Sequence, residues 1–401
     1  MKDEFRNKSL LVVSPRFPSP YGEPLGVFVK EQVDQIKRYF KKVVVISTSP
    51  YIPRFLTPFM QPRRKIESIM SNYSYDNVNV YYTRDLILPF YKSKNKWGDK
   101  AFEKSRNILR KINFKPDIIH PHFTWPSGYA AVKLGQQLNV PVVITAHGYD
   151  VYELPFRSEK WLEKVKYSLD NSNHIITVSR SNYKILTEKL GVRKEKITII
   201  PNGFDSKIFK EILQQQARKE LSIPSNRKVL LTVGNLIEIK GHKYLIRALK
   251  RVVEVEKDIL LVIVGSGPLE ESLKKLVRKL NLQNNVWLVG AKPHSEIPIW
   301  MNAADLFVLP SLSEGNPTVM FEALGVGLPF MGTAVGGVPE IITSEDYGLL
   351  CPPADPECLA EKILMALEKE WDRERIREYA KRFTWENIAK EIIDLYENLL
   401  K

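Results

Sequence analysis

The chain has 401 residues, which corresponds to two domains that are each large enough to bury a core of their own. With 44% hydrophobic and 26% charged residues, its composition is that of a globular protein and excludes a disordered or fibrous chain. The formal net charge of +14 leaves three classes of partner open: nucleic acid, an anionic membrane surface or a phosphorylated ligand.

Short β-branched segments alternate with helix-period segments along the first half, as in a parallel sheet crossed over by helices. Most of these segments are almost wholly apolar, which is typical of strands buried on both faces. A helix with one apolar stripe, from Val29 to Phe40, follows the turn that ends at Gly26. The predicted strands are residues 10–14, 43–46, 78–82, 117–119, 142–145, 175–178 and 197–200.

The second half repeats the alternation after residues 201–203, Pro-Asn-Gly, and a polar stretch around Gln214. We interpret this polar stretch as a linker, with a first domain over residues 1–203 and a second over residues 204–383. A last helix over residues 384–401, capped by Thr384, has an apolar face that must pack on something, the first domain being one candidate. The further predicted strands are residues 229–233, 260–264, 286–288, 306–309 and 328–331.

No apolar run reaches the roughly 18 residues that a membrane span requires. The apolar run at residues 10–13 is too short for a signal peptide. Cys351 and Cys358 are seven positions apart and predict neither a disulfide framework nor a zinc site. We therefore expect a cytoplasmic protein with reduced cysteines.

The loop after the strand at 306–309 contains the strongest candidate for a binding site, because ligands of open α/β sheets collect where strands lead into helices. Glu314 and Gly315 lie in this loop, and Glu322 follows about a turn and a half into the next helix. Backbone N–H groups there can meet a diphosphate, while carboxylates accept hydrogen bonds from hydroxyls. The same pattern fits a capped surface helix with two incidental acids.

Residues 314–329, Glu-Gly-Asn-Pro-Thr-Val-Met-Phe-Glu-Ala-Leu-Gly-Val-Gly-Leu-Pro, resemble the E-x7-E signature of family 4 retaining glycosyltransferases. That family has the GT-B fold, an α/β architecture of two doubly wound Rossmann-like domains that face each other across a cleft. The resemblance covers most of the chain, because further motifs occur in family order. These motifs are the turn at Gly26 and residues 117–120, 145–148, 178–179, 201–205, 234–241, 265–268 and 304–305.

The resemblance implies roles for single residues. Glu314 would contact the transferred sugar near the reacting centre, and Glu322 would bind the nucleotide ribose. His147 would be the second catalytic residue, hydrogen-bonded to the donor sugar across the cleft. A lone histidine at a strand end is more often a core residue, and the motif context is what favours function here. His120 and His122 lack that context, so we expect them to be structural.

Lys240 matches the family lysine that neutralises the donor diphosphate. The family usually has arginine where this chain has Asn235, so one cationic contact is missing. Only Gly26 is carried over from the family's glycine pair, since Gly22 is separated from it by three residues. Gly265 begins a broken G-x-G-x-x-G motif, for which a tight strand-to-helix turn is an equal interpretation. The predicted donor contacts are Gly26, Gly234, Asn235, Lys240, Gly265, Gly315, Asn316, Pro317, Thr318 and Glu322.

The sequence has no P-loop, no G-x-S-x-G elbow and no Asp-x-Asp pair for a divalent metal, which weakens kinase, hydrolase and metal-dependent transferase readings. Lys240 and the helix N-terminus at residues 316–318 would stabilise the departing nucleoside diphosphate, so we expect no metal and no cofactor. The resemblance implies retaining transfer of a hexose-type sugar to a glycan or lipid-linked acceptor in cell-surface polysaccharide, glycolipid or glycoprotein biosynthesis. Two alternatives remain: a nucleotide-sugar epimerase on this fold, and a non-catalytic sugar-nucleotide-binding subunit.

The positive charge lies in the first half, where residues 1–200 contain 34 Lys and Arg against 18 Asp and Glu. Residues 51–115 alone contain 14 basic and 5 acidic residues, interleaved with aromatics. This mixture suits the inner face of the cell membrane, and a solvated lysine-rich surface explains it equally well. Nucleic acid ranks third, because no binding motif accompanies the charge. The residues concerned are Arg63, Arg64, Lys65, Lys92, Lys94, Lys96 and Lys100, with Phe55, Phe59, Phe90, Tyr91 and Trp97.

Overall fold

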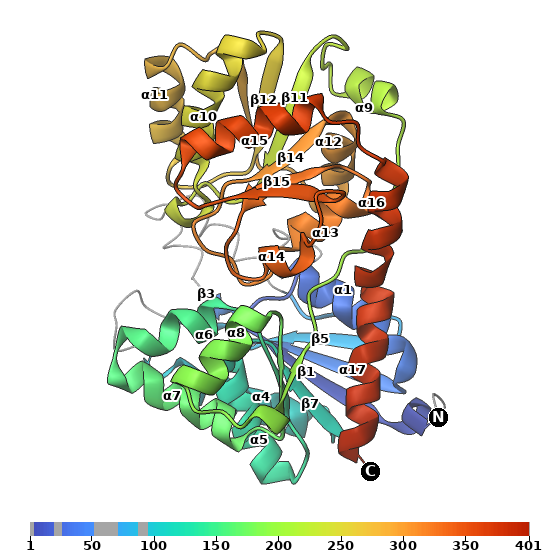
Figure 1. The fold of residues 1–401 in the computed structure, drawn as a ribbon. Coiled ribbons are helices and arrows are strands. Elements are labelled where there is room, and N and C mark those ends of the chain that lie inside the picture. Colours follow the sequence, from blue (N-terminus) through green and yellow to red (C-terminus); the bar gives the residue numbers. More distant parts are fainter. Residues whose placement is uncertain (1–3, 20–25, 52–70, 87–94, 401) are drawn as a thin grey trace. The chain divides into compact units, whose positions relative to one another are not determined.

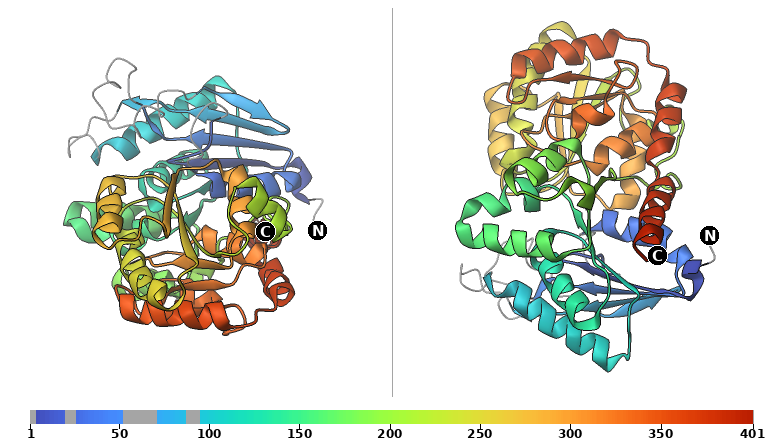
Figure 2. Two further views of the ribbon diagram at one scale, coloured as in Figure 1. Left: turned by 90° about the horizontal axis from the view of Figure 1, so that it is seen from above. Right: turned by 60° about the horizontal axis from the view of Figure 1, so that its bottom comes forward.

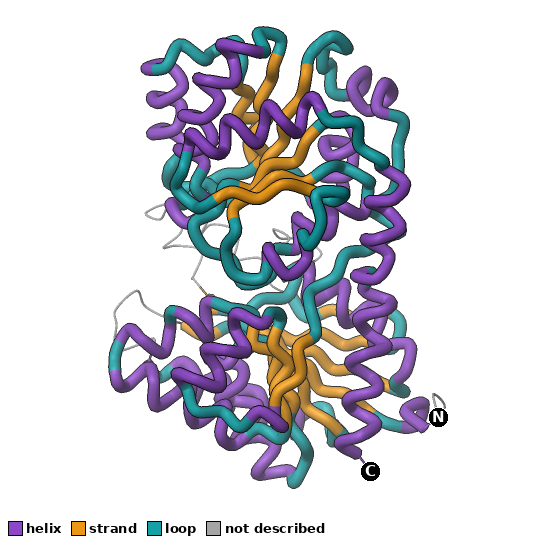
Figure 3. Tube along the Cα trace, viewed as in Figure 1, coloured by secondary structure: helices purple, strands orange, loops and turns teal. Residues whose placement is uncertain are grey.

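The computed structural model describes residues 4–19, 26–51, 71–86 and 95–400. The chain forms two compact units, of which unit 1 comprises Met1–Pro201 with Glu386–Lys401 and unit 2 comprises Asn202–Trp385. Each unit has a central sheet between helices (Figure 3). The division between the units falls two residues before the boundary that we placed after residue 203. Within the described residues, no helix is both long and apolar enough to cross a bilayer.

Unit 1 contains a mostly parallel sheet, with β4 antiparallel at its edge, and its strand order along the chain changes direction once. The sheet order is β4-β5-β2-β1-β7, with β8, β9 and β10 joined beside β7 by the bridges Ile119–Val142 and His122–Thr145. Successive parallel strands therefore extend one way from β1 and the other way from β7, as in a Rossmann fold. The strands are β1 (Ser9–Ser14), β2 (Lys42–Ser47), β4 (Tyr73–Tyr75), β5 (Val78–Tyr82), β7 (Ile118–Pro121), β8 (Val143–Ala146), β9 (His174–Thr177) and β10 (Ile197–Ile199), with a separate short pair β3 (Pro50–Tyr51) and β6 (Asp85–Leu86).

Helices cover both faces of this sheet. Alternate residues of a strand point to opposite sides, and the apolar side chains on each side pack against helices. Leu11 and Val13 pack with α4 and α5 on one face. His120, which lies beside Val12, meets α17 on the other face (Figure 2). The helices are α1 (Val27–Ile36), α4 (Trp97–Lys111), α5 (Tyr129–Leu138), α6 (Tyr149–Tyr152), α7 (Glu159–Asn171), α8 (Arg180–Lys184) and α17 (Trp385–Leu400).

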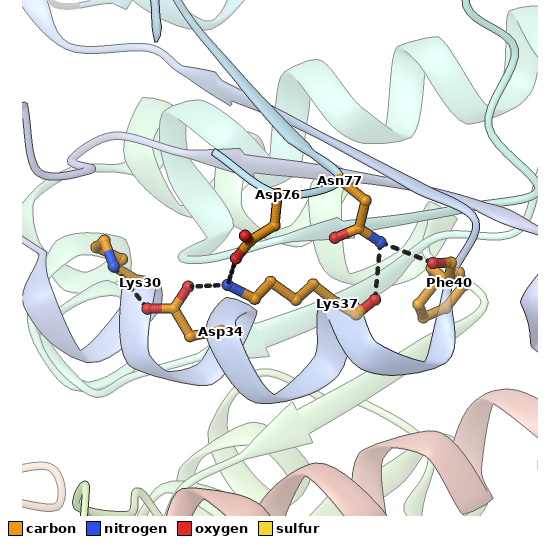
Figure 4. Close-up of polar contacts among 6 residues, drawn as sticks. All are labelled: Lys30, Asp34, Lys37, Phe40, Asp76 and Asn77. Carbon is orange, nitrogen blue, oxygen red and sulfur yellow. Dashed lines mark hydrogen bonds and ion pairs between the residues drawn. The ribbon is translucent and has the colours of Figure 1, made fainter. Parts of the chain in front are cut away.

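The end of α1 is held to the turn between β4 and β5 by a small polar cluster (Figure 4). Lys37 directly follows α1, and its Nζ lies 3.1 Å from Asp34 of that helix and 2.8 Å from Asp76 in the turn. The Asn77 amide donates to the carbonyl oxygens of Lys37 and Phe40 at 2.9 and 2.7 Å. A helix leaves its last carbonyls without intrahelical partners, and Asn77 supplies one to the carbonyl of Phe40. The Lys37 carbonyl accepts the Phe40 N–H as well, at 3.2 Å.

Unit 2 has a six-stranded parallel sheet with the order β13-β12-β11-β14-β15-β16, which again reverses direction beside its first strand. Leu230 faces the core under α10, α11 and α15, while Val229 and Leu231 face the core under α9, α12, α13 and α16 (Figure 1). The strands are β11 (Lys228–Val233), β12 (Ile259–Val264), β13 (Val286–Gly290), β14 (Leu306–Leu309), β15 (Phe330–Thr333) and β16 (Gly348–Cys351). The helices are α9 (Gln214–Glu220), α10 (His242–Val255), α11 (Glu270–Lys279), α12 (Ile297–Ala303), α13 (Thr318–Gly325), α14 (Val338–Ile341), α15 (Pro356–Glu368) and α16 (Arg373–Ala380).

Our interpretation of the polar stretch around Gln214 as a linker is wrong, because this stretch forms α9 and packs into unit 2. Ala217 is fully buried in the core of that unit, as is Phe209 just before the helix. Arg218 is nearly buried and pairs with Asp305 at 2.7 Å. The glutamines made this segment look like a solvent-exposed loop in the sequence. In the structure, Gln214 donates to the carbonyl of Ala304.

Candidate functional site

The centre of the unit 2 sheet is where its loops diverge. β11 and β14 are neighbours, but the chain continues from β11 to β12 on one side and from β14 to β15 on the other. The loops that follow the carboxyl ends of β11 and β14 therefore run in opposite directions. Ligands of open α/β sheets bind at such a point. The loop after β11 contains Gly234 to Lys240, and the loop after β14 contains Ser311 to Glu314.

Three side chains meet at this point. Lys240 Nζ lies 2.6 Å from Glu314 Oε1, and the Ser311 hydroxyl donates to the same oxygen at 2.6 Å. The Glu314 side chain is 9% exposed and that of Lys240 is 21% exposed, so the ion pair is mostly removed from water. The structure therefore brings together two residues, Lys240 and Glu314, that the sequence assigned to the donor diphosphate and the sugar.

Glycines allow the loops around this ion pair to approach one another. A Cβ on Gly241, whose φ is +66°, would lie 1.9 Å from the Pro310 carbonyl oxygen. The Leu312 N–H donates to the Ile239 carbonyl at 2.8 Å and ties the same two loops together. Gly265 approaches Gly234 in the same way, since its Cβ would lie 1.8 Å from the Gly234 oxygen. Backbone packing of a tight turn accounts for Gly265 without a ligand.

The N-terminus of α13 follows the Glu314 loop. Thr318 is its first helical residue, and Pro317 is its N-cap. The Asn316 side-chain oxygen accepts the backbone N–H of Asn202 at 2.8 Å, and the Asn202 amide donates to the Asn316 carbonyl at 2.7 Å. The Asn316 side chain is therefore engaged with the start of unit 2. Gly315 accepts the Gly337 N–H at 2.9 Å through its own carbonyl.

Glu322 lies on α13 and is 4% exposed. Its Oε1 is 3.2 Å from His294 Nε2, and the Phe209 ring packs against His294 with centroids 5.1 Å apart. Sequence reasoning missed His294, whose only signal was its place in the loop after β13. Asn235 lies in the loop after β11, exposed, with its carbonyl oxygen 3.2 Å from His242 Nε2. Burial lowers the pKa of His242 to about 4.

In unit 1, His147 follows β8 and contacts a second histidine. His147 Nε2 lies 2.9 Å from Nδ1 of His122, which follows β7, and the two rings are stacked with centroids 5.2 Å apart. The rings of Phe28 and Phe123 lie 4.9 and 4.7 Å from the His147 ring. Burial lowers the pKa of His147 to about 3 and that of His122 well below its ordinary value, so both are neutral at pH 7.

His120 lies behind this pair. Its ring stacks on His122 with centroids 4.8 Å apart, and its Nε2 is 2.6 Å from the Thr145 hydroxyl. Its Nδ1 is hydrogen-bonded to the Tyr396 hydroxyl on α17. Burial lowers the pKa of His120 to about 3. The structure thus places three histidines in one contiguous cluster, although the sequence singled out only His147.

A buried carboxylate, which sequence reasoning missed, holds the loop that contains His147. Asp150 accepts the backbone N–H groups of Thr124, His147 and Gly148 at 2.8, 3.1 and 2.9 Å. Burial raises the pKa of Asp150, and these N–H bonds oppose the rise. Gly148 has φ +141°, a conformation that favours glycine at this turn.

The remaining predicted residues lie elsewhere in unit 1. Gly26 precedes α1 with φ +82°, and a Cβ there would lie 2.4 Å from the Arg16 carbonyl oxygen. Lys96 and Lys100 are exposed, whereas Trp97 is half-buried and donates to the Thr48 carbonyl at 3.0 Å. Trp97 is thus part of the fold and not an exposed membrane contact. Gly22, Phe55, Phe59, Arg63, Arg64, Lys65, Phe90, Tyr91, Lys92 and Lys94 lie outside the described residues.

Two Rossmann-like units with polar groups at the carboxyl ends of their strands define a class of two-domain α/β proteins, and the comparisons identify the family. Residues 27–207 match the family profile "Glycosyltransferase Family 4", and residues 214–383 match "Glycosyl transferases group 1". An uncharacterized glycosyltransferase of Methanocaldococcus jannaschii is 31% identical over 75% of this chain and 80% of its own length. The chain therefore belongs to glycosyltransferase family 4 and is a glycosyltransferase.

Further relatives and solved structures agree. The putative teichuronic acid biosynthesis glycosyltransferase of Bacillus subtilis is 28% identical over 88% of each chain. Sucrose-phosphate synthase from Thermosynechococcus elongatus has a TM-score of 0.80 at 23% identity, covering 98% of this chain and 99% of that one. An Anabaena protein solved with UDP has a TM-score of 0.73 at 20% identity, covering 98% and 100%. The two units match structures of the GT-B fold, as expected from the sequence.

Proposed function

We propose that the chain transfers a hexose with retention of configuration from a nucleoside-diphosphate sugar, without a metal ion or separate cofactor. The observation that carries this proposal is the ion pair of Lys240 with Glu314 at the strand crevice of unit 2. Both residues match positions of the family signature, and both are presented by the loops that bind ligands in such sheets.

The ion pair suggests how the donor is received. A diphosphate arriving at Lys240 offers that ammonium group a stronger anionic partner than one carboxylate. Glu314 is then released to accept hydrogen bonds from sugar hydroxyls while Ser311 still holds one of its oxygens. As the sugar leaves, negative charge grows on the diphosphate, and Lys240 with the N–H groups that open α13 stabilises it.

Glu322 binds the nucleoside end of the donor. Its carboxylate is oriented by His294 at 3.2 Å and can accept two ribose hydroxyls. The Anabaena structures were solved with UDP and with UDP-glucose, which makes a uridine diphosphate hexose the first donor to test. Asn235 supplies an amide where the family usually has arginine, so we expect weaker donor binding than in relatives that have both cations.

For the acceptor, we propose a glycan or a lipid-linked sugar of a cell-surface polymer, bound by unit 1. The name of the B. subtilis relative refers to teichuronic acid biosynthesis, and a neighbour with a TM-score of 0.71 acts in lipopolysaccharide biosynthesis. The excess of basic residues over 51–115 supports attachment to the inner, anionic face of the membrane. Of the basic residues that the sequence analysis named in this stretch, Lys96 and Lys100 lie in the described part of the chain, and both are exposed.

Membrane attachment is tested by flotation with vesicles of phosphatidylglycerol and phosphatidylcholine at low and high salt. The protein should float at low salt and less at high salt, because exposed charges are screened. A variant with Lys92, Lys94 and Lys96 replaced by Gln should float less. Failure to float at either ionic strength would remove the membrane from the proposal and leave the transfer reaction intact.

Transfer itself is tested with a panel of nucleotide sugars. The true donor should raise the melting temperature, because a ligand that binds only the folded protein stabilises it. Adding acceptor extracts should then release nucleoside diphosphate, and this release should persist in EDTA. NMR of the product should show the anomeric configuration of the donor. An epimerised nucleotide sugar, or binding without turnover, would point to one of the two alternatives.

A further inference from the structure

We propose that His122 is a positioning residue for the transfer reaction, which donates its Nδ1–H to Nε2 of His147 and so fixes His147 in the Nδ1–H tautomer. This inference rests on the proposed function in one respect, namely that His147 contacts the donor sugar. It assigns a role to a residue that we expected from the sequence to be structural, and it states which chemical group His147 presents.

The contacts of the His147 imidazole leave the hydrogen bond to His122 to determine which ring nitrogen of His147 is protonated. Among the described residues, the hydrogen bond between His122 Nδ1 and His147 Nε2, 2.9 Å long, is the one polar contact of that ring. Phe28 and Phe123 hold the ring by packing and offer no polar side-chain atom. Packing sets where the ring lies, but only a hydrogen bond can choose between its two neutral tautomers.

Proton bookkeeping permits two arrangements of this pair, since each neutral imidazole has one N–H and one lone pair. In the first, His122 donates from Nδ1, which leaves His147 with an N–H at Nδ1 and His122 with a lone pair at Nε2. In the second, His147 donates from Nε2, which leaves His122 with an N–H at Nε2. His147 Nδ1 and His122 Nε2 are both buried and have no hydrogen-bond partner, so each arrangement leaves one N–H unpaired.

The two arrangements differ in where that unpaired N–H lies. An orphaned buried N–H is rarer in proteins than an under-used acceptor, because it is the more costly group to strip of water. In the second arrangement it would sit on His122, which is 1% exposed within the core. In the first it sits on His147, which is only partly buried and lies at the carboxyl end of β8, where ligands bind. The first arrangement is therefore favoured.

The residues behind His122 fix its ring without competing for its protons. Both ring nitrogens of His120 are already hydrogen-bonded, Nδ1 to the Tyr396 hydroxyl and Nε2 to the Thr145 hydroxyl, so neither competes for a proton of His122. His120 then stacks on His122 as a neutral aromatic plate. His122 thus has the His120 ring on one face, and its Nδ1 edge meets Nε2 of the nearly parallel His147 ring.

Backbone strain is concentrated beside the same pair. Phe123 has φ +69° and ψ +145°, a strained region that residues with a side chain rarely enter. Its N–H bonds to the Thr145 carbonyl at 2.8 Å, and its ring contacts His147. The chain therefore retains a strained turn between His122 and α5 in order to place a ring against His147.

The consequence for recognition is that His147 offers a donor and not an acceptor. The donor-sugar atom that it contacts must supply a lone pair, as a hydroxyl oxygen does. Because the N–H is already unpaired before substrate binds, no competing bond has to break when the sugar oxygen arrives. A substrate in which that hydroxyl is replaced by hydrogen should be rejected, since the buried N–H would stay unpaired.

The first experiment reads the tautomer directly. Histidine labelled with ¹⁵N gives two-bond ¹H–¹⁵N correlations that distinguish protonated from unprotonated ring nitrogens, and His147→Asn assigns the signals. In the free protein at pH 7.5 we expect His147 protonated at Nδ1 and His122 also protonated at Nδ1. His122→Phe and His122→Gln should shift His147 towards the Nε2–H tautomer. His122→Asn should preserve the Nδ1–H form, because its amide N–H overlays the imidazole Nδ1.

The matched control is His174, a buried histidine of unit 1 that lies outside the cluster. Like His120 it contacts a threonine hydroxyl, that of Thr198 at 2.9 Å. His174→Gln should leave the His147 signals unchanged. In sugar transfer, His122→Phe and His122→Gln should lower kcat by about tenfold or more, while His122→Asn retains most activity, since orienting partners act on this scale. The KM for the donor should change less than kcat, and melting temperatures confirm that the variants fold.

The outcomes separate this inference from the proposed function. A wild-type protein with His147 protonated at Nε2, or spectra of His122→Phe and His122→Gln that match the wild type, would overturn it even if sugar is transferred. Conversely, a wild-type protein that transfers no sugar from any nucleotide sugar would defeat the proposed function, and the spectra would still decide the tautomer.

Discussion

Lys240 and Glu314 are 74 positions apart in the chain, yet the Lys240 ammonium lies 2.6 Å from the Glu314 carboxylate. Their loops leave the two central strands of the unit 2 sheet, β11 and β14. The pair is therefore a product of the sheet order, which brings the ends of these strands together. Each residue is also the other's counter-ion while no donor is bound.

Replacing either partner should damage transfer in a different way. Lys240→Ala should weaken donor binding and lower kcat/KM by about 100-fold or more, because a donor to the developing charge is lost. Glu314→Gln keeps the shape and should lower kcat more than donor affinity. Initial rates of nucleoside diphosphate release measure both. Lys243→Ala is the control, because Lys243 pairs with Glu238 at an exposed position. Unchanged transfer in both site variants would show that the site is elsewhere.

Two glycines with similar backbone angles make a matched test of the loop contact. Gly241 and Gly290 have φ +66° and +75°, but only Gly241 has the Pro310 carbonyl where a Cβ would be, while nothing lies within 4 Å at Gly290. Gly290→Ala should cost about 1–2 kcal/mol of stability from its left-handed conformation alone. Gly241→Ala should cost more and should also reduce transfer, since it separates the loops of Lys240 and Ser311. Urea unfolding and initial rates compare the two, and equal losses would contradict the role of the loop contact.

Asn316 should prove more important for stability than for donor contact through its side chain. Its bonds to Asn202 are buried, and Asn316→Ala leaves the Asn202 N–H without its partner, at a cost of about 1–3 kcal/mol. The urea midpoint should fall accordingly, whereas Asn226→Ala at an exposed position should leave it unchanged. An unchanged midpoint in Asn316→Ala, combined with lost donor binding, would restore the role that the family resemblance implies.

The buried histidines should make the protein less stable in mild acid. The pKa values of His120 and His147 are lowered to about 3 by burial, from an ordinary value of 6.5. The unfolded chain takes up protons on both as pH falls below 6.5, whereas the folded protein does not until about pH 3. Their stabilising contribution is thus complete above pH 6.5 and declines below it, by up to ~1.4 kcal/mol per pH unit for each histidine.

Urea unfolding at pH 7.5, 6 and 5 measures this decline. The free energy of unfolding should be steady near pH 7.5 and fall towards pH 5. His120→Asn should show a slope that is shallower by about one proton, whatever its stability at pH 7.5. A free energy that stays level down to pH 5 would mean that these histidines are protonated in the folded protein.

The alternation of apolar runs predicted the strands of both units to within two residues at their ends, because strands buried on both faces have a strong compositional signal. It missed β4, an edge strand of partly exposed tyrosines, and β16, a short segment that begins with glycine. It also missed the two-residue strands β3 and β6. It also mistook α9 for a linker, since its burial depends on one small residue, Ala217, and on polar bonds.

At the candidate site, the sequence predicted Lys240, Glu314 and Glu322 from the family motif, and the fold brings Lys240 and Glu314 together. The partners of these residues carried no local signal. Ser311 lies in the same loop as Glu314, three positions before it, and nothing in its local pattern marks it as a site residue. His294 and His122 become recognisable only when segments that are distant in the chain are brought together. Asn316 shows the converse, because a residue inside the motif uses its side chain to hold the start of its own unit.

The terminal helix gives the chain an unusual order of assembly during synthesis. Residues 1–201 leave the ribosome first, but unit 1 also requires residues 386–401, which are made after the whole of unit 2. Until then Tyr396 cannot reach His120, and the hydrophobic face under α17 stays open. Unit 2 is contiguous and can close before its predecessor does, so the half of the protein that is synthesised first is the half that is finished last.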